Sequence, residues 1–330
     1  MKLAEISQRG AEFFGTKYAI MGGAMSWVSE RNLVAAISNA GGFGVIACGA
    51  MTPELLSNEI KATKLLTKKP FGVNLITMHP MLDELIDVTI ELGVTHVVLA
   101  GGLPKSASIT KLKQAGIKVI CFAPALVIAR KLVKMGADAI VIEGMEAGGH
   151  IGPVSTSVLA QEILPHIKEV PVFIAGGIGR GEMIATFLKM GASGCQLGTV
   201  FVCSTESIAH PNFKQAFIKA NARDAIVSVQ IDPDFPVIPV RAIANSASKE
   251  FAKAQHDAIS RFKSGELSKE AAQLAIEHYW AGALKRAVID GDIENGSLMA
   301  GQSVGMVNSI RSTAEIINEL AFQAETALNN

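Results

Sequence analysis

The sequence predicts an α/β fold: a closed (β/α)8 TIM barrel with a carboxy-terminal helical appendage. Short runs rich in valine and isoleucine alternate with longer amphipathic segments up to about residue 200. Parallel strands that are buried on both faces read as such continuous apolar runs. Eight of these runs favour a closed barrel. An open doubly wound sheet is the alternative, but no G-x-G-x-x-G motif follows the first run, as that fold would prefer.

Helix signals occupy the gaps between the predicted strands. Thr52 is a good N-cap, and Pro53 suits the first helical position. Four helices end on a glycine that suits a left-handed C′ residue, at Gly93, Gly116, Gly136 and Gly191. The predicted strands are Tyr18–Met21, Gly44–Cys48, Phe71–Ile76, His96–Ala100, Lys118–Phe122, Ala139–Glu143, Val172–Ala175 and Gly194–Leu197.

The alternation of short apolar runs with amphipathic segments ends after Ser204. Residues 232–239 hold three prolines and cannot continue a helix. Helical stretches are expected at about 246–263, 268–290 and 312–327. We therefore expect a barrel over residues 1–220, and a connector with a helical appendage over 221–330 that covers the active site.

Composition excludes several classes of protein. Thirty Lys and Arg residues balance thirty Asp and Glu residues, and only 5% of the chain is aromatic, so no nucleic-acid partner is expected. A mean hydropathy of +0.34 excludes disorder. The densest apolar stretch, 117–129, is interrupted by Lys118 and Pro124 and is too short to cross a membrane. The first ten residues lack the apolar run of a secretory signal, so we expect a cytoplasmic protein.

The four cysteines form no paired motif. We expect Cys48, Cys121, Cys195 and Cys203 to be small buried residues, without a disulfide framework or a metal site.

Glycine-rich loops mark the predicted active-site rim. Barrels of this kind build their sites from the loops that follow the strands, and glycine lets backbone come close to a ligand. A single glycine pair is explained by the need for a turn, but four pairs on one rim indicate a large, flat ligand. The loops are 22–25, 101–102, 144–152 and 176–179.

The last two predicted strands point to a phosphorylated cofactor. Barrels commonly hold a phosphate after strands seven and eight, where backbone N–H groups can bind it. Here these loops supply Gly176, Gly177, Gly198 and Thr199, with Gln196 just before them.

His150 is the leading candidate for chemistry. Histidine exchanges protons near neutral pH, and the glycines around it predict an open, uncrowded position on the rim. Glu143 ends the sixth strand on the same rim. It could bind a hydroxyl or amide group of the ligand, or cap the loop.

Several motifs together resemble a known flavin-dependent family. They are Glu143–Gly152, Phe71–Asn74, Ala175–Ile178 and Gln196–Thr199, joined by 210–214, Val240–Ile243 and 296–302. This family joins nitronate monooxygenases (formerly 2-nitropropane dioxygenases) with the FMN-containing enoyl-ACP reductase II enzymes. The carboxy-terminal segments are more similar to the reductase branch.

The resemblance implies FMN at the carboxyl end of the barrel. It implies that Asn74 forms a hydrogen bond with the flavin ring system and that His150 is the active-site histidine. One position departs from the family, because Ala24 stands where glycine is usual. The implied FMN-binding set is Gly23, Ala24, Met25, Asn74, Glu143, Gly148, Gly149, Ala175, Gly176, Gly177, Gln196, Gly198, Thr199 and Met299.

The leading functional expectation is an NAD(P)H-dependent trans-2-enoyl-ACP (enoyl thioester) reductase, with NADH or NADPH as hydride donor. The substrate would be a small molecule or bound to an acyl carrier, and a homodimer is plausible. The alternatives are a nitronate monooxygenase that oxidises alkyl nitronates with O2, and an NAD(P)H:quinone reductase. A barrel that binds FMN without turnover is the alternative from another class.

Overall fold

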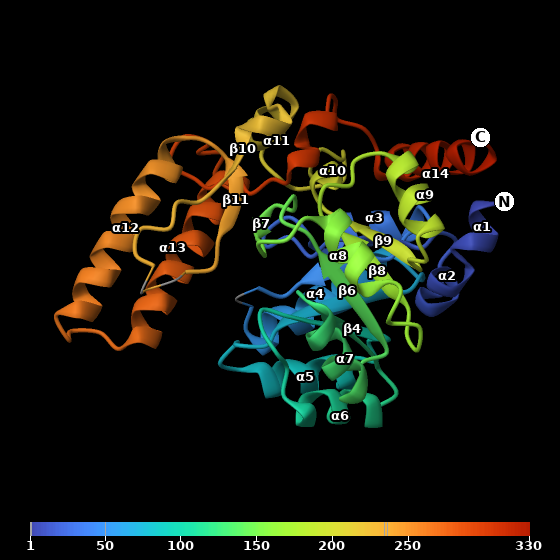
Figure 1. The fold of residues 1–330 in the computed structure, drawn as a ribbon, viewed down its shortest axis with the longest axis horizontal. Helices are drawn as coiled ribbons and strands as arrows, with labels where there is room; N and C mark the ends of the chain where they lie inside the picture. The colour runs from blue at the N-terminus through green and yellow to red at the C-terminus, as the bar shows by residue number, and fades with distance from the viewer. Residues whose placement is uncertain (1, 50, 234, 236) are drawn as a thin grey trace.

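Eight parallel strands curve into a barrel within the residues that this computed structural model describes, 2–49, 51–233, 235 and 237–330 (Figure 1). Neighbouring strands pair in the order β1-β9-β8-β6-β5-β4-β3-β2, and the ring closes through a bridge between Met21 and Phe43. This confirms the predicted barrel. The strands are β1 (Ile20–Gly22), β2 (Gly44–Ala47), β3 (Phe71–Ile76), β4 (His96–Ala100), β5 (Lys118–Phe122), β6 (Ala139–Glu143), β8 (Val172–Ala175) and β9 (Gly194–Leu197).

Six of these strands have the predicted bounds, and the first two differ at their ends. The carbonyl of Tyr18 accepts a hydrogen bond from the Thr16 hydroxyl at 2.8 Å, so β1 starts two residues later. The carbonyl of Cys48 accepts from the Met51 N–H at 2.8 Å, and this turn ends β2 at Ala47.

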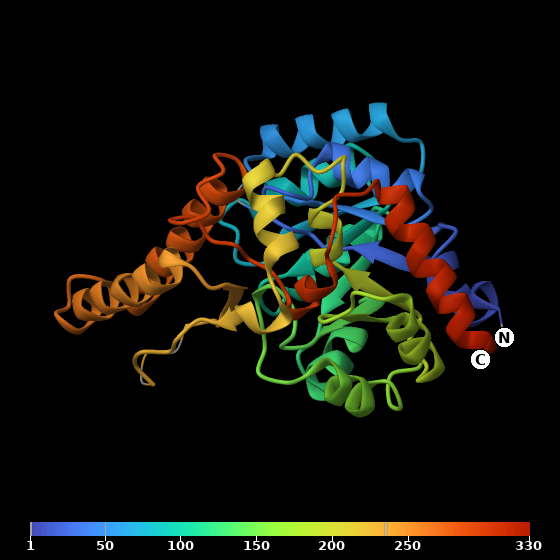
Figure 2. The same ribbon diagram turned by 90° about the horizontal axis from the view of Figure 1, so that it is seen from above.

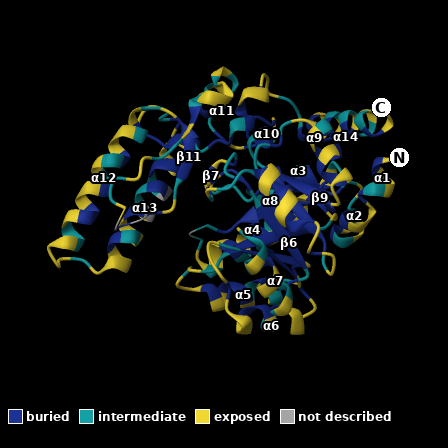
Figure 3. Ribbon diagram, in the orientation of Figure 1, coloured by how far each residue is buried: buried dark blue, intermediate teal, exposed yellow. Residues whose placement is uncertain are grey.

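Helices cover the outside of the barrel (Figure 3). The Thr52 side chain accepts from the Leu55 N–H and caps α4, as predicted. The four predicted glycine stops all have positive φ, from 59° at Gly93 to 102° at Gly191. The helices are α1 (Leu3–Ile6), α2 (Gln8–Phe14), α3 (Arg31–Asn39), α4 (Pro53–Leu66), α5 (Leu82–Glu91), α6 (Ser106–Gln114), α7 (Leu126–Lys134), α8 (Thr156–Ile163), α9 (Gly181–Lys189), α10 (Thr199–Val202) and α11 (Pro211–Lys219).

The strands separate two apolar layers. One cluster, which includes Val45, Val98 and Val141, fills the barrel interior, and a larger one lies between the strands and the helices. All four cysteines are buried, and burial raises the thiol pKa of Cys48 and Cys121 to about 12. The expectation of small buried residues is confirmed.

An aromatic plug closes the amino-terminal end of the barrel. Phe14 stacks on Phe43 with ring centroids 4.3 Å apart and on Phe173 at 4.4 Å. His96 is buried beside them, with Nε2 2.9 Å from the Phe13 carbonyl oxygen and Nδ1 2.8 Å from the Thr95 hydroxyl. Burial lowers the pKa of His96 to about 4.

We expect His96 to make the fold sensitive to acid. The histidine pKa is 6.5 in its ordinary state and about 4 in the fold, so between these values the unfolded chain takes up a proton that the folded chain excludes. Stability is therefore fully present above pH 6.5 and falls by about 3 kcal/mol as the pH drops towards 4. Denaturant unfolding between pH 7 and 5 measures this loss. His96→Gln removes the titration and should unfold with a flatter pH dependence, whereas parallel curves would contradict the assignment.

The appendage has a small core of its own. Its helices α12 (Ser246–Lys263) and α13 (Lys269–Val288) form a hairpin that projects from the barrel in both views (Figures 1 and 2). Phe251 packs on Trp280 at 4.2 Å between ring centroids. Where the hairpin returns to the barrel, the Lys285 ammonium lies 5.4 Å from the ring centroid of Trp27, in the loop after β1.

The last helix belongs to the wall of the barrel. Helix α14 (Thr313–Asn329) packs against α9 and α3, and Glu325 accepts from the Leu3 N–H at 2.9 Å, so the two termini lie side by side (Figure 1). Residues 221–330 thus contain a projecting hairpin and a helix that covers the barrel. The smaller elements of this part are β10 (Ala225–Val227), β11 (Val240–Ile243) and the 3-10 turns 222–224 and 302–306.

None of the helices in the described residues is long and apolar enough to span a membrane.

Candidate functional site at the carboxyl end of the barrel

Three polar side chains form a floor at the carboxyl end of the barrel. Successive side chains of a strand alternate between its faces. Val141 lies in the interior cluster, so Glu143, two residues further along β6, points inward at the top. In the strand register Glu143 is level with Ala175, and Ala175 is level with Gln196. Asn74 points inward from β3, where its amide donates to the Val98 carbonyl at 3.3 Å. The structure thus brings four predicted residues to one surface.

Glu143 is an unusual member of this floor. Glu143 is half-buried, and its carboxyl group has no hydrogen-bond partner among the described residues. This burial raises its pKa to about 8, so the group holds its proton at neutral pH. A protonated carboxyl group can both donate and accept a hydrogen bond.

The loop after β1 lies against the loop after β9. The Gly23 N–H donates to the Leu197 carbonyl at 2.8 Å, and a Cβ added to Gly198 would meet the Met25 sulfur at 3.4 Å. Ala24 packs against the barrel interior cluster. Its methyl group, the departure from the family pattern, therefore fills the interior beside the floor.

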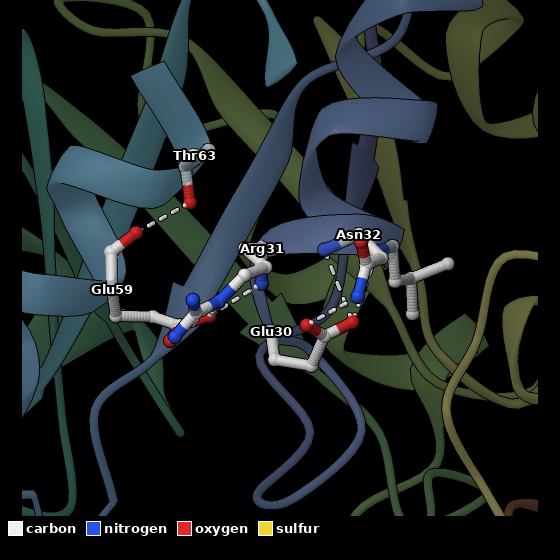
Figure 4. Close-up of polar contacts among 6 residues, drawn as sticks. Glu30, Arg31, Asn32, Glu59 and Thr63 are labelled. Carbon is white, nitrogen blue, oxygen red and sulfur yellow. Dashed lines mark hydrogen bonds and ion pairs between the residues drawn. The ribbon is translucent and has the colours of Figure 1, made fainter. Parts of the chain in front are cut away.

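The base of this loop is fixed by an ion pair (Figure 4). The Glu30 carboxylate accepts from the backbone N–H groups of Asn32 and Leu33 and caps α3. Arg31 pairs with the buried Glu59 of α4 at 2.5 Å. These contacts hold α3 against α4 directly below the rim.

The loop after β8 presents backbone donors. Gly176 and Gly177 adopt left-handed φ values of 94° and 72°. The N–H groups of residues 177–179 have no acceptor within the described chain. On the next loop, Thr199 accepts from the Gly301 N–H at 3.0 Å and keeps its own hydroxyl proton to donate. The predicted phosphate-binding residues are thus brought together.

His150 lies in a short strand rather than in an irregular loop, although its side chain is exposed, in keeping with the predicted uncrowded position. Gly149 and His150 form β7, which pairs with β11 in a three-stranded sheet. His150 is level with Val240, and the Ile151 N–H donates to the Pro239 carbonyl at 3.0 Å. The side chain is exposed at the rim. The histidine therefore has a fixed backbone and an accessible ring.

The segment after α13 closes over this strand. Met299 forms a bridge with Ala242, and its sulfur lies 3.6 Å from the position of a Cβ on Gly149. A Cβ on Gly148 would be only 2.5 Å from the backbone of Ala300 and Gly301. Gly148, Gly149 and Met299, three of the predicted FMN-binding residues, thus lie together.

Sequence reasoning missed the supports of this loop. The Glu146 carboxylate accepts from both the N–H and the hydroxyl of Thr156 at 2.9 Å. Arg241, a member of the Val240–Ile243 motif, is buried, and its Nε donates to the Met145 carbonyl of the same loop. The sequence signal that could have found Arg241 is a charged residue within the otherwise apolar segment Val240–Ile243.

A cavity of about 200 Å³ lies outside the floor, between α9, α10 and α14. Gly179 and Val200 line it next to the phosphate loops, and its charged side chains are Arg180, Arg311 and Glu319. It contains neither His150 nor the floor residues.

The geometry can now be compared with known proteins. The family model described as nitronate monooxygenase matches residues 7–323. The chain belongs to the nitronate monooxygenase family. It is therefore an oxidoreductase with the barrel of that family.

Three relatives illustrate the breadth of the family. FabK from Thermotoga maritima is 35% identical and superimposes with a TM-score of 0.86, covering 97% of each chain. A 5-hydroxy-7a-methyl-1-oxo-octahydro-1H-indene-4-carboxyl-CoA dehydrogenase from Mycobacterium tuberculosis is 30% identical over 96% of each chain. A probable nitronate monooxygenase from Staphylococcus saprophyticus is 28% identical, covering 98% of this chain and 99% of the relative.

Proposed function

We propose that this protein is an FMN-dependent oxidoreductase that reduces trans-2-enoyl thioesters with NADH or NADPH. The observation that carries the proposal is the inward row of polar side chains below a rim of open backbone donors, with His150 at its edge. Similarity to FabK and to a carboxyl-CoA dehydrogenase supports a thioester substrate.

The residues of the site fit FMN. The amides of Asn74 and Gln196 and the protonated Glu143 offer both donors and acceptors, which suits the polar edge of a flavin ring. The N–H groups of residues 177–179 suit a phosphate, because none of them has an acceptor in the described chain. The proposed FMN-binding residues are Gly23, Ala24, Met25, Asn74, Glu143, Gly148, Gly149, Ala175, Gly176, Gly177, Gln196, Gly198, Thr199 and Met299.

Bound FMN supplies the hydride chemistry, from nicotinamide to the β-carbon of the enoyl thioester. The protein orients the substrate and stabilises the negative charge that develops on the thioester oxygen. His150, exposed at the rim beside Gly149, is placed to donate a proton to the α-carbon or a hydrogen bond to that oxygen.

Anaerobic stopped-flow absorbance of the holoenzyme tests the function. We expect NADH or NADPH to bleach the flavin, and a trans-2-enoyl thioester to restore its colour. Bleaching by an alkyl nitronate without nicotinamide would instead support the monooxygenase, which the family model and the 28% identical relative favour. A yellow protein that responds to none of these compounds would contradict both reactions.

A further inference from the structure

Arg241 is a buried arginine outside the set assigned to cofactor or substrate. It is 4% exposed in β11, between Val240 and Ala242. Its Nε donates to the Met145 carbonyl at 2.9 Å, and its Nη1 donates to the Ala225 carbonyl at 2.5 Å. Arg241 therefore links β10 to the loop that bears His150.

The charge of Arg241 is costly where it lies. No carboxylate within the described residues forms an ion pair with it. Burial lowers its pKa, and the more distant Glu146 only partly offsets this. Burying a charged group without a paired carboxylate destabilises a fold. A neutral apolar residue would pack in this strand at lower cost, so a role in the site accounts for the arginine better than stability does.

Arg241 and its strand hold the His150 loop at both ends. The guanidinium fixes the carbonyl of Met145, five residues before His150. The backbone of β11 pairs directly with the histidine, because Val240 is level with His150 and Arg241 with Gly149. One short strand thus sets both the start of the loop and the position of the reacting side chain.

We propose that Arg241 is a positioning residue for His150. This inference rests on the proposed function, because His150 is assigned there to the oxidative half-reaction with the thioester. Without the guanidinium, residues 144–148 lose an anchor and the imidazole samples a wider range of positions. A displacement of about 1 Å can slow a reaction a hundredfold. Lysine has one donor group in place of the planar fork and cannot make both bonds in the same geometry.

Two variants and a matched control separate positioning from stability. Arg241→Met removes both bonds, and Arg241→Lys keeps the charge and folds with less disturbance. Asn245→Ala is the control, because the Asn245 amide also donates to two backbone carbonyls of the appendage, those of Ile293 at 2.8 Å and Gly296 at 2.7 Å. Asn245 does not touch the His150 loop. Thermal melting of each holoenzyme compares the loss of stability.

Both Arg241 variants should slow reoxidation of the reduced enzyme by the thioester, by about ten- to a hundredfold for methionine and less for lysine. Bleaching by NAD(P)H should stay within about twofold, and Asn245→Ala should leave both half-reactions unchanged at a similar loss of melting temperature. If both Arg241 variants melt early but reoxidise at the normal rate, Arg241 is structural only and the proposal fails.

Hydrogen exchange provides a readout that does not depend on the substrate. The peptide covering residues 144–152 should exchange faster in both Arg241 variants than in Asn245→Ala, because the Ile151 N–H depends on its bond to Pro239. If the thioester fails to reoxidise even the unmodified enzyme, the proposed function fails, while faster exchange still supports the anchoring of the loop. Unchanged exchange overturns the anchoring itself.

Discussion

Replacing His150 by alanine is expected to slow reoxidation of the reduced holoenzyme by an enoyl thioester by about a hundredfold or more, in the range of acid–base contributions. The expectation follows from an exposed imidazole on a backbone fixed by β11. Bleaching by NAD(P)H needs no proton from His150, so we expect it to change by less than about threefold. Single-turnover absorbance separates these two steps.

His166→Ala is the matched control for this experiment. His166 is also exposed, but it lies before β8, at the opposite end of the barrel. Its replacement should leave both half-reactions unchanged. If His150→Ala reoxidises at the normal rate, His150 takes no part in the reaction. That result would not contradict the proposed FMN site.

Replacing Gly148 by alanine is expected to loosen FMN binding by about five- to a hundredfold. The new methyl group would lie 2.5 Å from the backbone of Ala300 and Gly301, so two backbone segments must move apart. Overpacking of this kind costs about 1–3 kcal/mol, and 1.4 kcal/mol corresponds to a tenfold change in affinity. The segment that moves carries Met299, which lies over Gly149.

Gly152→Ala tests whether the effect comes from this contact. A Cβ there would meet no heavy atom within 4 Å, although the residue lies in the same loop. We expect the Gly152 variant to keep its FMN, as measured by flavin fluorescence during titration of the apoprotein. Equal affinity in both variants would contradict the close approach at Gly148.

The strand ends show how much of the site the sequence predicts. Glu143 ends an apolar run, so the sequence alone places it on the carboxyl rim of the barrel, whereas the site roles of Asn74 and Gln196 follow from the family resemblance. The same local rules located the helix stops at Gly93 and Gly191. These features depend only on residues close together in the sequence.

Strand β7 could not be predicted by such rules. It is only two residues long, and its partner β11 follows a proline-rich connector. The bond from Arg241 to Met145 joins positions 96 residues apart. Pairing over such a distance leaves no periodic signal in either segment, so the sequence indicated an open loop at His150 where the fold has a sheet.

The pairing of β7 with β11 also has a consequence for biosynthesis. All eight barrel strands have left the ribosome once residue 197 emerges, and amino-terminal units generally fold first during translation. His150 gains its backbone partner only after residue 243 has followed. A nascent chain can therefore pair its eight barrel strands before β11 fixes the backbone of His150 and before α14 completes the wall of the barrel.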